Sequence, residues 1–171
     1  MTNRPESAPP ATAPVVLPEG SALDRLSGLL TQFRVHAHLF HAGPLCGVTH
    51  FDAQPGRGFL HVLRRGHMVL SHHDGSGAPE RIVVDEPTLL FYPRPLEHRF
   101  HNAPVEGSDF VCATLDFEGG MLHPLVRALP PLLVLPLSAV HGLEHTLTLL
   151  FAETERVRCG QRLLADRLFD V

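Results

Sequence analysis

Residues 87–102, PTLLFYPRPLEHRFHN, decide the fold class because they read as two short strands joined by a proline-stiffened turn. The apolar run TLLFY is typical of a buried strand. Pro93 and Pro95 fix the backbone of the turn that follows, and a second strand then begins. This arrangement aims His98 into the interior of a β-structure, whereas a generic turn followed by an exposed histidine is the alternative.

Segments with similar β-strand patterns lie on both sides of this stretch, from about Phe33 to Phe117. Short runs of alternating or β-branched residues are separated by Gly and Pro turns, which is typical of an antiparallel sandwich or barrel. The turn RRG and the loop DGSGAPE are both expected to be hairpin connections. The fold class is therefore predicted to be mainly β. The predicted strands are FRVHAHLF, CGVTHF, GFLHVLRR, HMVLSHH, RIVVD, TLLFYP, HRFHN and DFVCATLDF.

The segments that flank the predicted barrel have different compositions. Residues 1–20 are rich in Pro and Ala and are expected to form a flexible leader, because they offer too little apolar surface to offset the entropy of ordering. Ser21 is expected to cap a short helix that opens the barrel domain at 21–117. Residues 118–171 read as a helical segment that contains an extended stretch, PPLLVLP, and a helix from Ser138 to about position 156. The leucine stripes of this segment exceed what one small barrel needs to cover, which predicts a homodimer through these helices.

Composition and charge exclude several classes of function. The 171-residue chain carries a formal net charge of −4, so it lacks the basic surface of a nucleic-acid-binding domain. No apolar run approaches the ~20 residues of a membrane helix, and the first residues lack the pattern of a signal peptide, which predicts a cytoplasmic protein. Three cysteines in such a chain favour free thiols or metal ligands over disulfides, and 13 histidines raise the expectation of metal chemistry.

The stretch around His98 resembles the second sequence motif of the cupin family. That motif runs as a glycine, five residues, Pro-x-Gly, two residues, His, three residues and Asn. Pro93, His98 and Asn102 match it, whereas Pro87 and Pro95 stand at the positions of its two glycines.

The first cupin motif, in which a His-x-His pair and a glutamate hold a catalytic metal, is mostly missing. Counting back from Gly66, the glutamate position falls on Phe59, and the preceding AQPGRG contains no histidine. His61 lies two residues later, on the same face of the strand. The resemblance therefore implies a cupin barrel without the usual catalytic ligands, and we predict no catalytic residue.

From Ser21 to its end, the chain resembles the N-terminal cupin domain of one branch of AraC-type bacterial transcription regulators. The matching segments are LCG at 45–47, FLHVLRRG at 59–66, the proline-bounded strand to His98, VCATLDF at 111–117, HPLVRALPPLLVLP and RCGQRLLADRLFDV. The resemblance implies a jelly-roll cupin barrel followed by C-terminal α-helices, with the barrel receiving an effector signal. In such regulators a pair of helix-turn-helix units binds DNA. We find no such part in this sequence, so we expect no nucleic-acid binding by this chain and expect residues 118–171 to dimerise or to link to that missing domain.

Within this resemblance, Cys46, His61, His98 and Cys112 each lie on a predicted strand. Two thiolates and two imidazoles suit tetrahedral Zn²⁺ or another divalent transition metal, and we predict a metal site formed by these four residues. A closed four-ligand site leaves no position for a substrate, so we expect a structural or sensory role in which oxidants or electrophiles attack the thiolates. Burial of each cysteine as a small apolar side chain is the alternative.

Two other functions stay open from the sequence. In one, the barrel interior binds a small organic effector, and any metal is structural or absent. In the other, the chain is a metal-dependent cupin enzyme of the dioxygenase or isomerase type that uses His61, His98 and His50, with water completing the site.

A rival histidine cluster lies earlier in the chain, where His36 and His38 share a strand face and His41 follows in a loop. A solvated polar face is the expected explanation for it. His72 and His73 are predicted to be exposed, and Glu97 is predicted to lie outside the barrel. Cys159 is expected to be a structural or incidental thiol.

Overall fold

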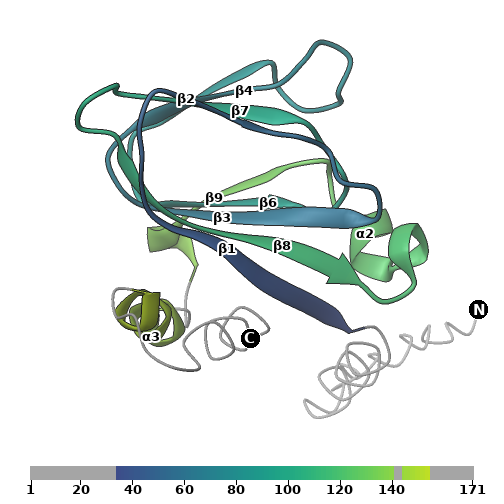
Figure 1. Ribbon diagram of the computed structural model, residues 1–171. Helices are drawn as coiled ribbons and strands as arrows, with labels where there is room; N and C mark the ends of the chain where they lie inside the picture. The colour runs from purple at the N-terminus through teal and green to yellow at the C-terminus, as the bar shows by residue number, and fades with distance from the viewer. Residues whose placement is uncertain (1–33, 141–143, 155–171) are drawn as a thin grey trace, which may run out of the picture. The chain divides into compact units, whose positions relative to one another are not determined.

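The computed structural model describes residues 34–140 and 144–154, which contain two β-sheets lying face to face (Figure 1). The five-stranded sheet has the order β1-β8-β3-β6-β9 and the four-stranded sheet the order β2-β7-β4-β5. All neighbouring strands are antiparallel, and strands β1 to β8 follow the jelly-roll order of two packed Greek keys. The strand bounds are β1 Val35–Leu45, β2 Val48–Phe51, β3 Arg57–Arg65, β4 Met68–Ser71, β5 Arg81–Val84, β6 Thr88–Tyr92, β7 His98–Asn102, β8 Ser108–Phe117 and β9 Leu133–Pro136. All eight predicted strands are present, and the prediction of a mainly β fold is confirmed.

Strand β8 is buried on both of its faces, which is why its sequence is apolar almost throughout. Phe110 and Cys112 point between the two sheets and belong to the main hydrophobic core. Ala113 and Leu115 point the other way, where they pack against Val126 of helix α2 (Pro124–Ala128). Because side chains alternate along a strand, β8 carries the sandwich interior on one face and a helix-covered surface on the other.

The turn RRG does not form the predicted hairpin. Strand β3 belongs to the five-stranded sheet and β4 to the four-stranded sheet, so this turn carries the chain from one sheet to the other. Gly66 has φ +99°, and a Cβ there would lie 2.7 Å from the Ser108 hydroxyl oxygen, so the corner favours glycine. The loop DGSGAPE does join a hairpin, because β4 and β5 are paired.

Strand β1 contains an irregularity that sequence alternation does not reveal. Its pairing with β8 shifts between Leu39 and His41, which leaves Phe40 as an extra residue in the ladder. A bulge of this kind re-aims side chains, and here the Phe40 ring contacts Phe51 of β2 and Phe59 of β3.

The chain after β8 combines short helices with one further strand. The predicted extended stretch PPLLVLP contains β9, which pairs with β6, so the five-stranded sheet continues past the predicted barrel end at Phe117. Two 3₁₀ helices, η1 (Gly120–Leu122) and η2 (Leu137–Ala139), precede α3 (Glu144–Thr154), the last helix that the structure describes. The expected leader at 1–20, the helix at Ser21, Cys159 and the final helix lie outside the described residues, and the division into domains stays a prediction.

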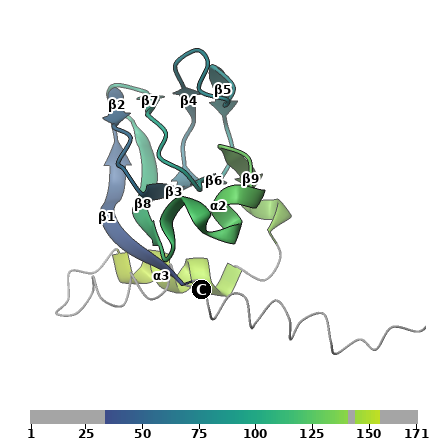
Figure 2. The same cartoon turned by 90° about the vertical axis from the view of Figure 1, so that its right-hand side faces the viewer.

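Helix α3 lies on the outer side of the five-stranded sheet (Figure 2). Leu150 and Leu147 pack there against Val111 of β8 and Leu39 of β1. None of the described helices has the length and apolar character that a membrane crossing requires.

We expect this contact to contribute measurably to folding. Leu150 is 2% exposed, so Leu150→Ala should lower the free energy of unfolding by about 2–4 kcal/mol in a urea titration. Leu149→Ala is the matched control, because Leu149 is 47% exposed on the same helix and should cost well under about 1 kcal/mol. Equal losses in the two variants would contradict the packing of α3 on β8.

Candidate functional site

Two buried histidines face each other between the sheets. His61 lies on β3 and His98 on β7, and their Nε2 atoms are 2.9 Å apart. His98 begins the strand that the proline-bounded turn was predicted to aim inward, and it is buried as expected. The sandwich thus brings together two of the four predicted ligands through a direct imidazole–imidazole hydrogen bond.

The neighbours of His98 determine where the protons sit in this pair. The Nδ1 atom of His98 is 2.8 Å from the carbonyl oxygen of Leu96, which can only accept, so this Nδ1 carries a proton. In neutral His98, Nε2 is then an acceptor, and the Nε2–H of His61 donates to it. Neutral His61 therefore presents a lone pair at Nδ1, and no group in the described part of the chain donates to that atom.

The surroundings of the pair hold both imidazoles neutral. Burial is the main cause that lowers the pKa of His98 to about 4. Burial also lowers the pKa of His61 well below its usual value, and the nearby His98 lowers it further. Tyr92 stacks on His98 at a centroid distance of 4.1 Å, and Phe51 stacks on its ring at 4.9 Å. A hydrogen-bonded polar pair is thus enclosed by aromatic rings.

The structure treats the two predicted cysteine ligands differently. Cys112 is buried directly opposite His61 in the β3–β8 register, so both side chains point between the sheets. Burial raises the pKa of the Cys112 thiol and keeps it protonated. Cys46 is exposed between β1 and β2, where its Sγ lies 3.9 Å from the carbonyl oxygen of Val105.

The donor groups meet the requirements of a metal only in part. Two imidazole Nε2 atoms face each other, and His98 donates its other N–H to a carbonyl, as metal-ligating histidines do. His61 lacks such an acceptor at Nδ1. Among residues 34–140 and 144–154, no group of three or more His, Cys, Asp and Glu side chains is arranged to hold a metal ion.

A cavity of about 620 Å³ opens on the side of the sandwich where β1 and β2 form the sheet edges. Aromatic side chains line part of its wall, namely Phe40, Phe51 and Phe59. Thr114 of β8 lies beside Phe59 in the strand register and completes this wall. A sequence reading misses the role of Phe40, because the bulge changes which side chains of β1 point inward.

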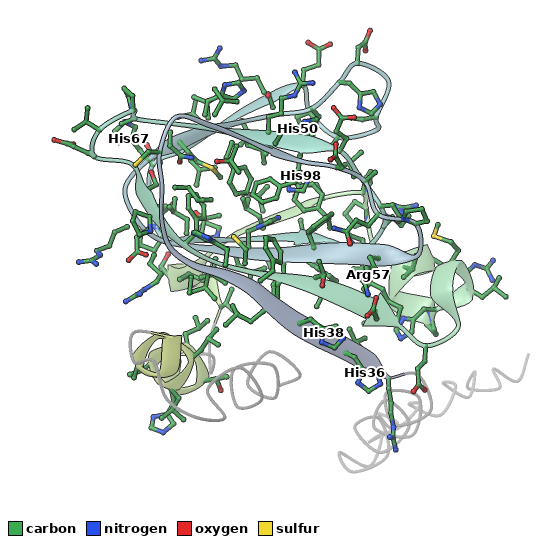
Figure 3. The ribbon with its side chains drawn as sticks, in the orientation of Figure 1. His36, His38, His50, Arg57, His67 and His98 are labelled. Carbon is green, nitrogen blue, oxygen red and sulfur yellow. The ribbon has the colours of Figure 1, made fainter. Side chains whose placement is uncertain are left out.

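Charged and polar side chains surround the mouth of the cavity. Arg57 of β3 donates from Nε to Oδ1 of Asp116 at 2.7 Å, and the Nε2 of His38 lies 3.3 Å from the other oxygen of that carboxylate. His50 lies on the opposite layer from His38 and Arg57 (Figure 3). Its Nε2 lies 2.9 Å from a carboxylate oxygen of Glu97. The hydrogen bond and charges around Glu97, led by its bond to His50, lower the pKa of this carboxyl.

The other histidines singled out in the sequence have separate partners. His36 lies 3.5 Å from Glu118, and the Nε2 of His41 lies 3.1 Å from the carbonyl oxygen of Gly43. His50 lies on the opposite face of β2 from Phe51, so it does not join the buried pair. His72 was predicted to be exposed, and this prediction is wrong. The residue is half-buried, and its Nε2 lies 3.0 Å from the Tyr92 hydroxyl oxygen.

The strand order, the interior histidine pair and the open cavity define the molecule as a jelly-roll β-sandwich with an accessible interior. A family model described as Cupin matches residues 24–171, so the chain belongs to the cupin family and the cupin prediction is confirmed.

A comparison with solved structures matched the crystal structure of apo ToxT K231A from Vibrio cholerae strain SCE256. The two share 8% sequence identity with a TM-score of 0.42, over 81% of this chain and 53% of that one. This chain therefore spans about half the length of that protein. No curated protein matches the sequence.

The lowered pKa values of His61 and His98 predict that stability falls in mild acid. The unfolded chain binds protons at these two sites below about pH 6.5, whereas the folded chain binds one at His98 only near pH 4, and the lowered pKa of His61 acts in the same direction. Their contribution is therefore fully present above about pH 6.5 and is lost as the pH falls toward 4, at up to about 1.4 kcal/mol per pH unit for each histidine.

Urea titrations of metal-free protein between pH 7 and 4.5 check this prediction. His61→Phe and His98→Phe should each flatten the dependence on pH by roughly one proton. An unchanged slope in both variants would show that the two imidazoles titrate alike in the folded and unfolded chains.

Proposed function

We propose that this cupin domain is the effector-binding sensor domain of an AraC-type bacterial transcription regulator. The regulator class rests on the ordered resemblance that runs from Ser21 through Gly66, His98 and Cys112. The observation that carries the sensor role is the cavity between β1 and β2, which connects solvent with the aromatic interior.

The chemistry of the cavity supports an organic effector. A volume of about 620 Å³ lies within the range of roughly 300–1,000 Å³ that small-molecule sites occupy. Apolar rings offer contact area, and the polar groups at the mouth orient a ligand through a few directed contacts. Three of the nine lining residues are phenylalanines and six are polar or charged, so the cavity offers more directed contacts than the mainly apolar sites that most small molecules occupy.

A sensor role is favoured over the alternative of a metal-dependent enzyme. The cupin position for a glutamate ligand is occupied by Phe59, a buried apolar side chain of the cavity wall. His50, the third histidine that an enzyme was expected to use, contacts Glu97 at the mouth instead of joining His61 and His98.

Filling the cavity should abolish effector binding. Thr114→Met places a longer side chain into the cavity from β8, and we expect at least about a tenfold loss of affinity for any compound that binds there. The measurement is a fragment-library screen by ligand-observed NMR, followed by titration of the hits. Val83→Met is the control, because it adds similar bulk at an exposed position on β5 and should leave affinity unchanged.

Two results would contradict the sensor proposal at this cavity. One is a library without hits on folded wild-type protein. The other is a set of hits whose affinity is the same in Thr114→Met and Val83→Met. Turnover of a bound compound would favour the enzyme alternative.

A metal ion held by the buried pair is the second candidate, and the facing Nε2 atoms of His61 and His98 favour it. Two imidazole nitrogens on tetrahedral zinc lie about 3.3 Å apart, so the pair would have to open by a few tenths of an ångström. Cys112 would supply a thiolate from across the β3–β8 register, and Cys46 would have to move inward. Bound zinc would tie β3, β7 and β8 together, and loss of a thiolate to an oxidant would release it.

Metal content by elemental mass spectrometry, on protein purified without a His tag, tests this candidate. We expect about one zinc per chain in the wild type and none in His61→Phe or Cys112→Ser. Loss in Cys46→Ser as well would establish all four predicted ligands, whereas retention would restrict the site to the buried residues. A wild type without metal would contradict the candidate. The homodimer and the cytoplasmic location stay predictions.

A further inference from the structure

The buried pair leaves one hydrogen-bond acceptor without a donor in the described part of the chain. The Nδ1 atom of His61 carries a lone pair, because its Nε2–H is used by His98 and because His98 is fixed by Leu96. A buried acceptor without a donor loses the hydrogen bond that water gives it in the unfolded chain. Any molecule that brings a donor to this atom regains that hydrogen bond in a site of low dielectric.

A wall of three phenylalanines separates this histidine from the cavity. Each of the three lines the cavity, and each also contacts the His61 ring, at centroid distances of 6.3 Å for Phe40, 4.8 Å for Phe51 and 5.6 Å for Phe59. The cavity floor and the immediate surroundings of His61 are therefore made by the same side chains.

Phe40 is the most exposed part of this wall. Phe51 and Phe59 are 8% and 2% exposed, whereas Phe40 is 45% exposed. It is also the extra residue of the β1 bulge and has no partner of its own on β8, while Leu39 and His41 on either side of it are paired. Rotation of the Phe40 ring toward solvent would open the cavity toward His61 without disturbing the packed core.

We propose that the cavity takes a small, uncharged aromatic alcohol, of the phenol class, whose O–H donates to Nδ1 of His61 while its ring takes the place vacated by Phe40 and packs against Phe51 and Phe59. This inference rests on the proposed function, that an organic effector binds in the cavity. It adds the chemical class of that effector and the atom that recognises it.

Each element of that class follows from a feature of the site. A ring is favoured because offset and edge-to-face contacts with Phe51 and Phe59 exceed what an aliphatic chain gains there. A donor is required because neutral His61 offers only a lone pair at Nδ1. Charge is disfavoured beside His61, because its aromatic neighbours offer no counter-ion and burying an ion without one is costly. A carboxylate is excluded at Nδ1, since it has no proton to donate at neutral pH.

The pair p-cresol and p-xylene separates these features in one experiment. The two probes have nearly the same shape, and a hydroxyl in the first replaces a methyl in the second. p-Xylene is the more hydrophobic, so burial alone would make it the tighter ligand. We expect the reverse order in titrations of the wild type, with p-cresol at least about tenfold tighter.

A second readout on the wild type reports on the proposed hydrogen bond directly. In a long-range ¹H–¹⁵N spectrum of the histidine rings, Nδ1 of His61 should appear unprotonated, and its resonance should move on addition of p-cresol but not of p-xylene. This measurement needs no variant and does not depend on the stability of one.

Two variants complete the test. His61→Phe removes the acceptor and should make the two probes bind alike. Phe40→Ala removes this ring at a half-exposed position while keeping His61, so the preference for p-cresol should persist. If His61→Phe does not fold, the ring spectrum and Phe40→Ala decide the outcome.

The possible results separate this inference from the proposal on which it rests. Equal binding of the two probes, or tighter p-xylene, overturns the hydrogen bond to His61 while the cavity remains a ligand site. Failure of p-cresol to bind, when library hits do bind and are lost in Thr114→Met, overturns the phenol class only. Failure of p-cresol together with an empty library screen overturns the sensor proposal as well.

Discussion

The antiparallel register between β3 and β8 is the constraint on which the site depends. It sets His61 opposite Cys112, Phe59 opposite Thr114 and Arg57 opposite Asp116. The first row supplies His61 of the buried histidine pair, the second supplies part of the cavity wall, and the third supplies part of the polar mouth. A slip of either strand by one residue would turn that strand's members of these rows to the outer face. The register is marked at both ends of the ladder by ion pairs, Arg57 with Asp116 and Arg65 with Asp109.

Local sequence patterns were sufficient for the strands and for the direction of His98, because alternation and proline turns act over a few residues. They were not sufficient where a feature depends on which strands become neighbours. The RRG turn reads as a hairpin until β3 and β4 are seen in different sheets. Arg57 and Asp116 are 59 positions apart, and nothing near either residue marks the other as its partner. The inward position of Phe40 could not be predicted from alternation, because a single extra residue in β1 changes which side chains point inward. The predicted metal ligands illustrate both situations, since strand phase placed His61, His98 and Cys112 inside while the position of Cys46 depended on the path between two sheets.

The His61–His98 hydrogen bond is better understood as part of a site than as a source of stability. Burying two imidazoles removes them from water, and one hydrogen bond between them offsets only part of that cost, because Nδ1 of His61 has no donor in the described residues. An apolar pair of similar volume would fill the same space without that cost.

Strand β8 connects the histidine pair directly to the outer helices. Cys112 and Thr114 point into the sandwich, while Val111 and Ala113 between and beside them contact the α3 and α2 layers. A displacement of β8 at the cavity therefore acts directly on the surface that the C-terminal helices cover.

The two candidate ligands make opposite demands on a single proton. A metal bound between the histidines needs both Nε2 atoms unprotonated, so the proton of neutral His61 must move to Nδ1, which then becomes a buried donor without an acceptor. An alcohol bound from the cavity needs the proton to remain on Nε2, where His98 already accepts it. The carbonyl of Leu96 fixes His98 in the same tautomer in both cases, so the difference is confined to His61. The tautomer of this one residue thus distinguishes a metal-holding barrel from an effector-binding barrel. The hydrogen bond between the two histidines favours the second, because it leaves at Nδ1 of His61 the acceptor that an alcohol requires.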